Sequence, residues 1–467
     1  MFKKRLFLIV VLASALYLWC WHYGNCIDVE SHFERGMTEY NNKDFFQAAQ
    51  WFRKAAEQEH ATAQYQLGRL YEKGTGVVQD VIEAVMWYRK AAEAGNVEAQ
   101  NALGLKYKTG QGVIRDLNQA VLWFQKAADQ GHVEAQANLG EIYFSSQGIA
   151  KDLKQAEKWN RQAAEAGNAH AQYNLGLMYE NGISVDQEIK QAIQWYQKAA
   201  ELRYAPAQTR LGQMYHKGQG INQDFKQALE WYQKAAKQGE AEAQFHLGLM
   251  SENGQGVNED IAQAAKWFRQ SAEQGYAKAQ NRLGDMYFSG TGVQQNVTQA
   301  AQWYHKAAEQ GNIEAQFQLG IMYQDGQGVK SDLKQAIKWY RKAADQNLAD
   351  AQFQLGIIYY DGQGVAQDWK EAATWYGKAA EQGHAKAQNN LGLLYYDGDG
   401  VPQDFAKAAQ WYRKAADQGN VEAQSNLAVM YREGEGVSQD LTQAGYWFKK
   451  AAEQGDGYAE EALEELD

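Results

Sequence analysis

The chain has 467 residues, of which 45% are hydrophobic, and its formal net charge is −11. This hydrophobic content is that of a folded protein and excludes a disordered chain. The negative charge argues against a nucleic-acid partner, because a phosphate backbone would repel the protein. Cys20 and Cys26 are its two cysteines. The remaining sequence therefore has neither a disulfide framework nor a thiolate zinc site.

Residues 1–26 have the pattern of an export signal, because Lys3, Lys4 and Arg5 precede an apolar run from Leu6 to Trp21. As a helix this run spans about 24 Å, against a hydrocarbon core of roughly 30 Å. Flanking basic and aromatic side chains reduce that mismatch. We favour an uncleaved anchor in the inner membrane with the rest of the chain on the periplasmic side. The alternatives are a cleaved signal, giving a secreted or periplasmic protein, and a buried core helix.

A short pair of helices is predicted for residues 27–62. Gly36, Tyr40, Ala48 and Trp51 recur at the spacing of packed helices, and the connection around Lys43 is short. This pair precedes a much longer periodic region.

Residues 63–458 repeat with a period of 36. The pair Ala-Gln begins each of eleven units, from Ala63 to Ala423, and a tryptophan recurs at the same step from Trp51 to Trp447. A fixed period of this length is typical of a solenoid, in which each unit packs on its neighbours. We therefore predict an all-α, right-handed α-solenoid of about twelve helix pairs, which residues 459–467 close as a capping helix.

The first unit shows how the sequence specifies a helix pair. Leu67 and Tyr71 belong to the apolar stripe of a first helix, in which Gly68 allows the partner helix to approach closely. A glycine-containing loop follows, and Asp80 stands where an N-cap residue of the second helix is expected. Trp87 belongs to the apolar stripe of that second helix.

The unit resembles the Sel-1-like repeat. The resemblance is carried by Ala-Gln-x-x-Leu-Gly-x-x-Tyr, Gly-x-Gly-Val-x-x-Asp and Ala-x-x-Trp-Tyr-x-Lys-Ala-Ala-Glu-x-Gly. This family is related to the tetratricopeptide repeat, to which the pair at residues 27–62 is closer. The resemblance implies an adaptor that assembles membrane or periplasmic complexes, acts in signalling, or mediates contact between bacterium and host. A cysteine-rich branch is associated with β-lactams, but this chain lacks its paired cysteines.

The residues facing away from the apolar stripe of each first helix differ between units. Across three adjacent units they are apolar or aromatic. We predict that this row lines the concave face and binds a protein or peptide. The alternatives are packing against the next unit and self-association. The predicted protein-binding residues are Phe317, Ile321, Phe353, Ile357, Tyr360, Leu393 and Tyr396.

The sequence predicts no catalytic residue, cofactor or metal site. Ser331 and Lys334 match the Ser-x-x-Lys of penicillin-interacting enzymes, and Lys108-Thr109-Gly110 matches their Lys-Thr-Gly, but both lack the required setting. We predict a non-catalytic interaction scaffold of the cell envelope or secreted space. The alternatives are an envelope enzyme or binder acting on β-lactams or peptidoglycan, and a secreted factor that contacts a host protein.

Overall fold

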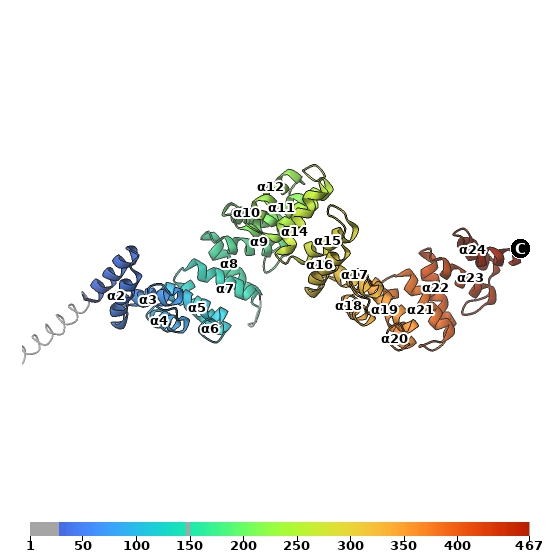
Figure 1. The fold of residues 1–467 in the computed structure, drawn as a ribbon, viewed down its shortest axis with the longest axis horizontal. Helices are drawn as coiled ribbons and strands as arrows, with labels where there is room; N and C mark the ends of the chain where they lie inside the picture. The colour runs from blue at the N-terminus through green and yellow to red at the C-terminus, as the bar shows by residue number, and fades with distance from the viewer. Residues whose placement is uncertain (1–27, 146–149, 467) are drawn as a thin grey trace, which may run out of the picture. The chain divides into compact units, whose positions relative to one another are not determined.

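The computed structural model describes residues 28–145 and 150–466, which are helical or loop throughout. It consists of two compact units, residues 1–238 and 239–467, whose helices follow one another in chain order (Figure 1). The predicted anchor at residues 1–26 lies outside the described residues. Within them no helix is both long and apolar enough to cross a membrane.

In the first unit a helix over residues 28–41 precedes eleven more helices. These are α2 (Phe45–Glu57), α3 (Ala61–Lys73), α4 (Val81–Glu93), α5 (Val97–Thr109), α6 (Leu117–Asp129), α7 (Val133–Ser145), α8 (Leu153–Glu165), α9 (Ala169–Asn181), α10 (Ile189–Glu201), α11 (Ala205–Lys217) and α12 (Phe225–Ala236).

The second unit continues the same alternation. Its helices are α13 (Ala241–Asn253), α14 (Ile261–Glu273), α15 (Ala277–Ser289), α16 (Val297–Glu309), α17 (Ile313–Asp325), α18 (Leu333–Asp345), α19 (Ala349–Asp361), α20 (Trp369–Glu381), α21 (Ala385–Asp397), α22 (Phe405–Asp417), α23 (Val421–Glu433), α24 (Leu441–Ala452) and α25 (Gly457–Leu466). From α3 on, each odd-numbered helix is the first of a pair and each even-numbered helix the second. The predicted α-solenoid of 36-residue helix pairs is confirmed.

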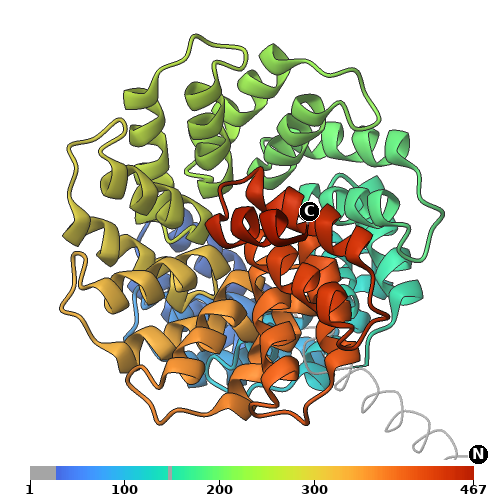
Figure 2. The ribbon, with the colours of Figure 1, turned by 90° about the vertical axis from the view of Figure 1, so that its right-hand side faces the viewer.

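The helix boundaries follow from local chemistry. Asp80 caps α4 by accepting hydrogen bonds from the backbone N–H groups of Ile82 and Glu83, at 2.9 and 3.0 Å. Gly74 ends α3 in the left-handed conformation, with φ of +65°. The loop between them is closed because the Asp80 N–H donates to the carbonyl of Tyr71 at 3.0 Å. These long loops project away from the rows of helices (Figure 2).

A small residue at the centre of each first helix sets the spacing within a pair. A Cβ atom on Gly392 would lie 2.7 Å from the ring of Tyr412, which is buried on the partner helix. Gly68 lies equally close to Tyr88, as the sequence predicts. Close packing of this kind leaves no room for a larger side chain.

The recurring tryptophan joins each pair to the one before it. Trp375 of α20 packs into the cluster that Tyr340 of α18 and Leu355 of α19 form. Trp339 packs in the same way on the cluster that contains Tyr304. A lysine three residues later covers the ring in nine repeats, with Nζ 3.9 to 4.4 Å from the ring centroid.

The invariant glutamine of the Ala-Gln pair forms a second, polar connection. Gln352 donates to the carbonyl of Ala344 on the preceding helix and accepts from Gln382 at 2.7 Å. The glutamine–glutamine bond recurs in eight repeats at 2.6 to 2.9 Å. Where Ala94 and Leu202 replace the donor, the buried Oε1 atoms of Gln64 and Gln172 have no partner.

We predict that Gly392→Leu lowers the stability of the second unit by about 1–3 kcal/mol or more, because the new side chain overlaps Tyr412. The measurement is denaturant unfolding followed by circular dichroism. Gly377→Leu is the matched control, because Gly377 lies inside α20 with no atom within 4 Å of its Cβ position. Equal midpoints for the two variants would contradict the close approach.

Ala94→Gln is expected to stabilise the first unit by about 1 kcal/mol, because its amide supplies the missing donor to Gln64. Thermal unfolding should show a higher midpoint for this variant. Ala94→Met adds similar length without a donor and should not produce that gain. A gain of the same size for methionine would attribute the effect to packing instead of the hydrogen bond.

Candidate functional site

The seven predicted binding residues lie on α17, α19 and α21, and we call them the apolar row. Phe317 and Ile321 are on α17, and the helices α19 and α21, which carry the other five, are in contact with each other. All seven side chains are half-buried. The structure therefore arranges them on equivalent turns of successive first helices, with part of each side chain exposed.

The buried part of the row contributes to the fold. The ring of Phe317 lies 5.7 Å from that of Tyr340, and the ring of Phe353 lies 5.9 Å from that of Tyr376. Phe353 also stacks on His384, the N-cap residue of the next first helix, at 4.5 Å. The alternative of packing against the next unit thus applies to Phe353, and Phe317, Ile321, Ile357 and Tyr360 also pack on clusters that include the next first helix. The exposed part of each side chain still offers a surface to a partner.

Tyr396 closes the row at its C-terminal end. Its ring meets Phe405 edge-on at 5.1 Å, and its hydroxyl donates to the carboxylate of Glu435 at 2.6 Å. This hydrogen bond, together with burial, raises the pKa of Tyr396 to about 12. The hydroxyl is protonated at neutral pH with or without this shift, and its hydrogen bond to Glu435 holds the ring in place.

Negative charge borders the apolar row. Asp325, Asp361 and Asp397 are the exposed last residues of α17, α19 and α21, and we call them the acidic border. Burial, followed by the nearby carboxylate of Asp399, raises the pKa of Asp397. Carboxylates at the C-terminal ends of helices also add to the negative end of each helix dipole. The border therefore favours a cation.

The unit that contains the acidic border also carries most of the negative charge of the chain. Residues 239–467 contain 32 Asp and Glu against 19 Lys and Arg, whereas residues 1–238 contain 25 against 27. Essentially all of the net negative charge lies in the second unit, which also carries the apolar row. Such a field increases the rate at which a basic partner arrives.

The motifs that resemble those of penicillin-interacting enzymes have structural roles. The Ser331 hydroxyl donates to the carbonyl of Gln324 at 3.1 Å, and Lys334 lies in the first turn of α18. Lys108 forms an ion pair with Glu141 at 2.7 Å, and Gly110 caps α5 with φ of +77°. The Lys-Thr-Gly therefore stands at the end of a helix and not on a strand.

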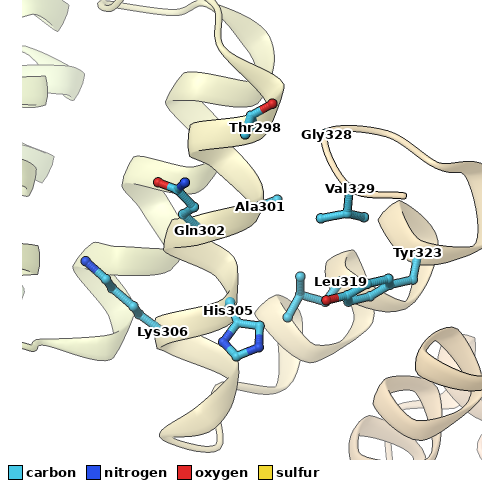
Figure 3. Close-up of a pocket in the computed structure, with 9 residues that line it drawn as sticks. All are labelled: Thr298, Ala301, Gln302, His305, Lys306, Leu319, Tyr323, Gly328 and Val329. Carbon is cyan, nitrogen blue, oxygen red and sulfur yellow. The ribbon is translucent and has the colours of Figure 1, made fainter. Parts of the chain in front are cut away.

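A pocket that the sequence did not reveal lies between α16 and the loop that follows α17 (Figure 3). Its volume is about 410 Å³. Figure 3 shows Leu319, Tyr323 and Val329 across from Ala301 and His305. The lining residues are Thr298, Ala301, Gln302, His305, Lys306, Leu319, Tyr323, Gly328 and Val329.

The equivalent place is also open in another repeat, where a pocket of about 400 Å³ lies beside Arg269 between α14 and the loop that follows α15. His305 stands where six other repeats carry arginine, and in five of them the arginine donates to the hydroxyl of the tyrosine eighteen residues later. Arg341, for example, donates to Tyr359 at 2.5 Å. Imidazole is shorter than the arginine side chain, and His305 makes no such hydrogen bond to Tyr323. Across the twelve repeats this position holds six arginines, three glutamines, one glycine, one lysine and His305, so the sequence alone did not single out the histidine.

We predict that the new side chain in His305→Arg donates to the Tyr323 hydroxyl, because arginine makes this hydrogen bond in five other repeats. The thermal midpoint should rise slightly, as expected for one partly exposed hydrogen bond of about 0.5–1.5 kcal/mol. A crystal structure of the variant gives the direct measurement. An arginine extended into solvent, without this hydrogen bond, would contradict the prediction.

The geometry defines an α-solenoid whose first helices present variable side chains. Models of the Sel1 repeat match the chain in twelve consecutive stretches between residues 42 and 456, at residues 42–60, 61–96, 97–132, 133–168, 169–204, 205–240, 241–276, 277–312, 313–348, 349–384, 385–420 and 421–456. The chain belongs to the Sel1 repeat family.

Two solved structures are similar over most of their length. One is c5321, a protective antigen present in uropathogenic Escherichia coli strains that displays an SLR fold. It is 39% identical, with 90% of each chain covered and a TM-score of 0.65. The other, a Sel1 repeat protein from Oxalobacter formigenes, is 35% identical over 66% of this chain and 90% of its own, with a TM-score of 0.50. No curated protein matches the chain.

Proposed function

We propose that this protein is a scaffold that binds a basic, partly apolar segment of a partner protein along the apolar row. Sel1 repeat proteins are generally protein-interaction scaffolds. The observation that carries the more specific proposal is the row itself, in which seven half-buried apolar side chains continue over three first helices and end at the acidic border. Apolar anchors with a charged rim are the usual composition of a protein-binding surface.

The proposed binding mode follows from the spacing of the row. The apolar row offers the ring faces of Phe317 and Phe353 and the aliphatic edges of Ile321 and Ile357, whereas the acidic border offers only carboxylates. A bound segment would place apolar side chains on the rings and lysine or arginine beside the border. Because the helices are already stacked, the scaffold loses little conformational entropy on binding.

A test replaces row residues by those that occupy the same positions in other repeats. Phe353→Asn copies Asn389, and Ile357→Gln copies Gln213, so both changes suit the fold. We expect the double variant to weaken partner binding at least 10-fold, equivalent to about 1.4 kcal/mol or more. Peptides selected from a displayed library on the wild-type chain supply the ligand for titration calorimetry.

The selected peptides should be rich in Lys or Arg together with aromatic or aliphatic residues, and their affinity should fall with added salt. Lys370→Ala on the second helix α20 is the control for a surface change outside the row. Selection of acidic peptides, or equal affinity of the double variant and the control, would refute the proposed site. Circular dichroism confirms that each variant keeps its helices.

The location proposed for this scaffold is the outer side of the inner membrane, with residues 1–26 as an uncleaved anchor. The order of basic residues and apolar run supports it, and the similar Escherichia coli protein is a protective antigen, as expected for an exported protein. Protease added to spheroplasts should then digest the repeats, and the mass of the membrane-bound chain should include Met1. A soluble chain that lacks its first residues would instead indicate a cleaved signal.

A further inference from the structure

Large apolar side chains on the helices α2, α4 and α6, and on the loops that precede α4 and α6, form one exposed surface. Six residues between 46% and 90% exposed belong to it, and we call them the exposed patch. They are Phe46, Val78, Ile82, Met86, Ile114 and Leu122. Exposed apolar residues scattered singly are normal, but a contiguous group on a folded chain indicates an interaction surface.

Backbone contacts place the six residues next to one another. A Cβ atom on Gly76 would clash with the Phe45 carbonyl, so the loop bearing Val78 lies on the first turn of α2, beside Phe46. A Cβ on Gly112 would be 2.7 Å from the Val81 carbonyl oxygen, which places the loop bearing Ile114 on the first turn of α4.

Side chains on α4 and α6 continue the same surface beyond the loops. Ile82 lies in that first turn, and Met86 follows one turn later on the same face of α4. Leu122 occupies in α6 the place that Met86 occupies in α4.

The fold does not require apolar residues at these positions. Where α4 has Ile82 and Met86, α8 has Lys154 and Lys158, and α18 has Lys334 and Lys338. Where the loops have Val78 and Ile114, the later loops have residues such as Asp186, Asn222 and Lys330. Most later repeats carry polar or small residues at these positions, although α24 exposes Tyr446 at the place of Met86.

We propose that the exposed patch rests on the surface of a phospholipid bilayer, which the N-terminal anchor holds beside it. This inference rests on the proposed location and is independent of the apolar row. The apolar run ends at Trp21 and the described residues start with a helix at residue 28, so at most about 25 Å of chain separates the run from this helix. That helix packs on α2 through Phe33 and Phe52. The anchor thus keeps the first pairs near the membrane.

Shape and charge favour a bilayer as the occupant. Val78 and Ile114 project from loops at 87% and 90% exposure, a form suited to insertion between headgroups. Exposed Arg115 follows Ile114 directly and exposed Lys43 lies three residues before Phe46, while exposed Asp44 and Asp80 also border the patch in sequence. Without Lys3, Lys4 and Arg5 of the anchor, residues 28–238 contain 24 Lys and Arg against 25 Asp and Glu, whereas the second unit is strongly acidic. An anionic leaflet therefore repels the second unit much more than the first.

The test places an environment-sensitive nitrobenzoxadiazole label at Ile82→Cys in the full chain, with Cys20 and Cys26 replaced by Ser. The label at Lys334→Cys, the equivalent position in α18, is the matched control. Both proteins are reconstituted into vesicles of phosphatidylcholine and phosphatidylglycerol and recovered by flotation. We expect blue-shifted emission and quenching by doxyl-labelled lipid at position 82 but not at position 334. Met86→Lys with Leu122→Lys should reduce that quenching at least twofold.

The outcomes separate the anchor from the patch. Protein that floats with the vesicles while its label at position 82 stays as exposed as that at position 334 overturns the patch contact alone. Protein that does not float overturns both the anchor and the contact. Blue-shifted emission at position 82 that appears in detergent without lipid and increases with protein concentration identifies a second copy as the occupant, and also overturns the proposal.

Discussion

The contact between each recurring tryptophan and the preceding helix pair holds successive repeats together. Trp375 belongs to α20, yet it completes the cluster of α18 and α19, so neither pair has a full core alone. The Gly392–Tyr412 approach fixes the spacing inside a pair, and the glutamine bonds pin the first turn of each first helix to its surroundings. Because these three contacts use the same positions in most repeats, the other surface positions are free to vary. Function in such an array depends on the variable positions, and here these differ in kind between the two units.

Much of the helical fold can be predicted from the sequence, because helix pairing, capping and close approach depend on residues that are near one another in the chain. The 36-residue period predicts paired helices, Asp80 predicts an N-cap, and the glycine at position 68 predicts a close approach to Tyr88, each of which the structure confirms. Left-handed backbone also occurs where the repeat glycine is replaced, at Arg203 with φ of +63° and Asn347 with φ of +72°. The stacking neighbours impose this conformation even on an arginine, which shows that tertiary packing outweighs the local preference.

The features that escaped prediction depend on two residues far apart in sequence. The role of Gln352 appears only when it is paired with Gln382, thirty residues later. The pocket beside His305 forms only where α16 and the loop that follows α17 come together. The sequence identified the residues of the apolar row. It did not show which part of each side chain is buried, because the contact of Phe353 with His384 depends on how the next helix pair stacks. Periodicity indicates which positions vary, and only coordinates show what each side chain touches.

Hydrogen exchange measured by mass spectrometry on Trp375→Ala tests the nearest-neighbour account most directly. Removing the indole from a buried site costs about 3–5 kcal/mol, and this loss should be confined to the pairs it joins. We expect faster exchange in α18, α19 and α20, with α23 and α24 unchanged. A uniform loss of protection throughout residues 239–467, or unchanged protection in α18 and α19, would contradict the account.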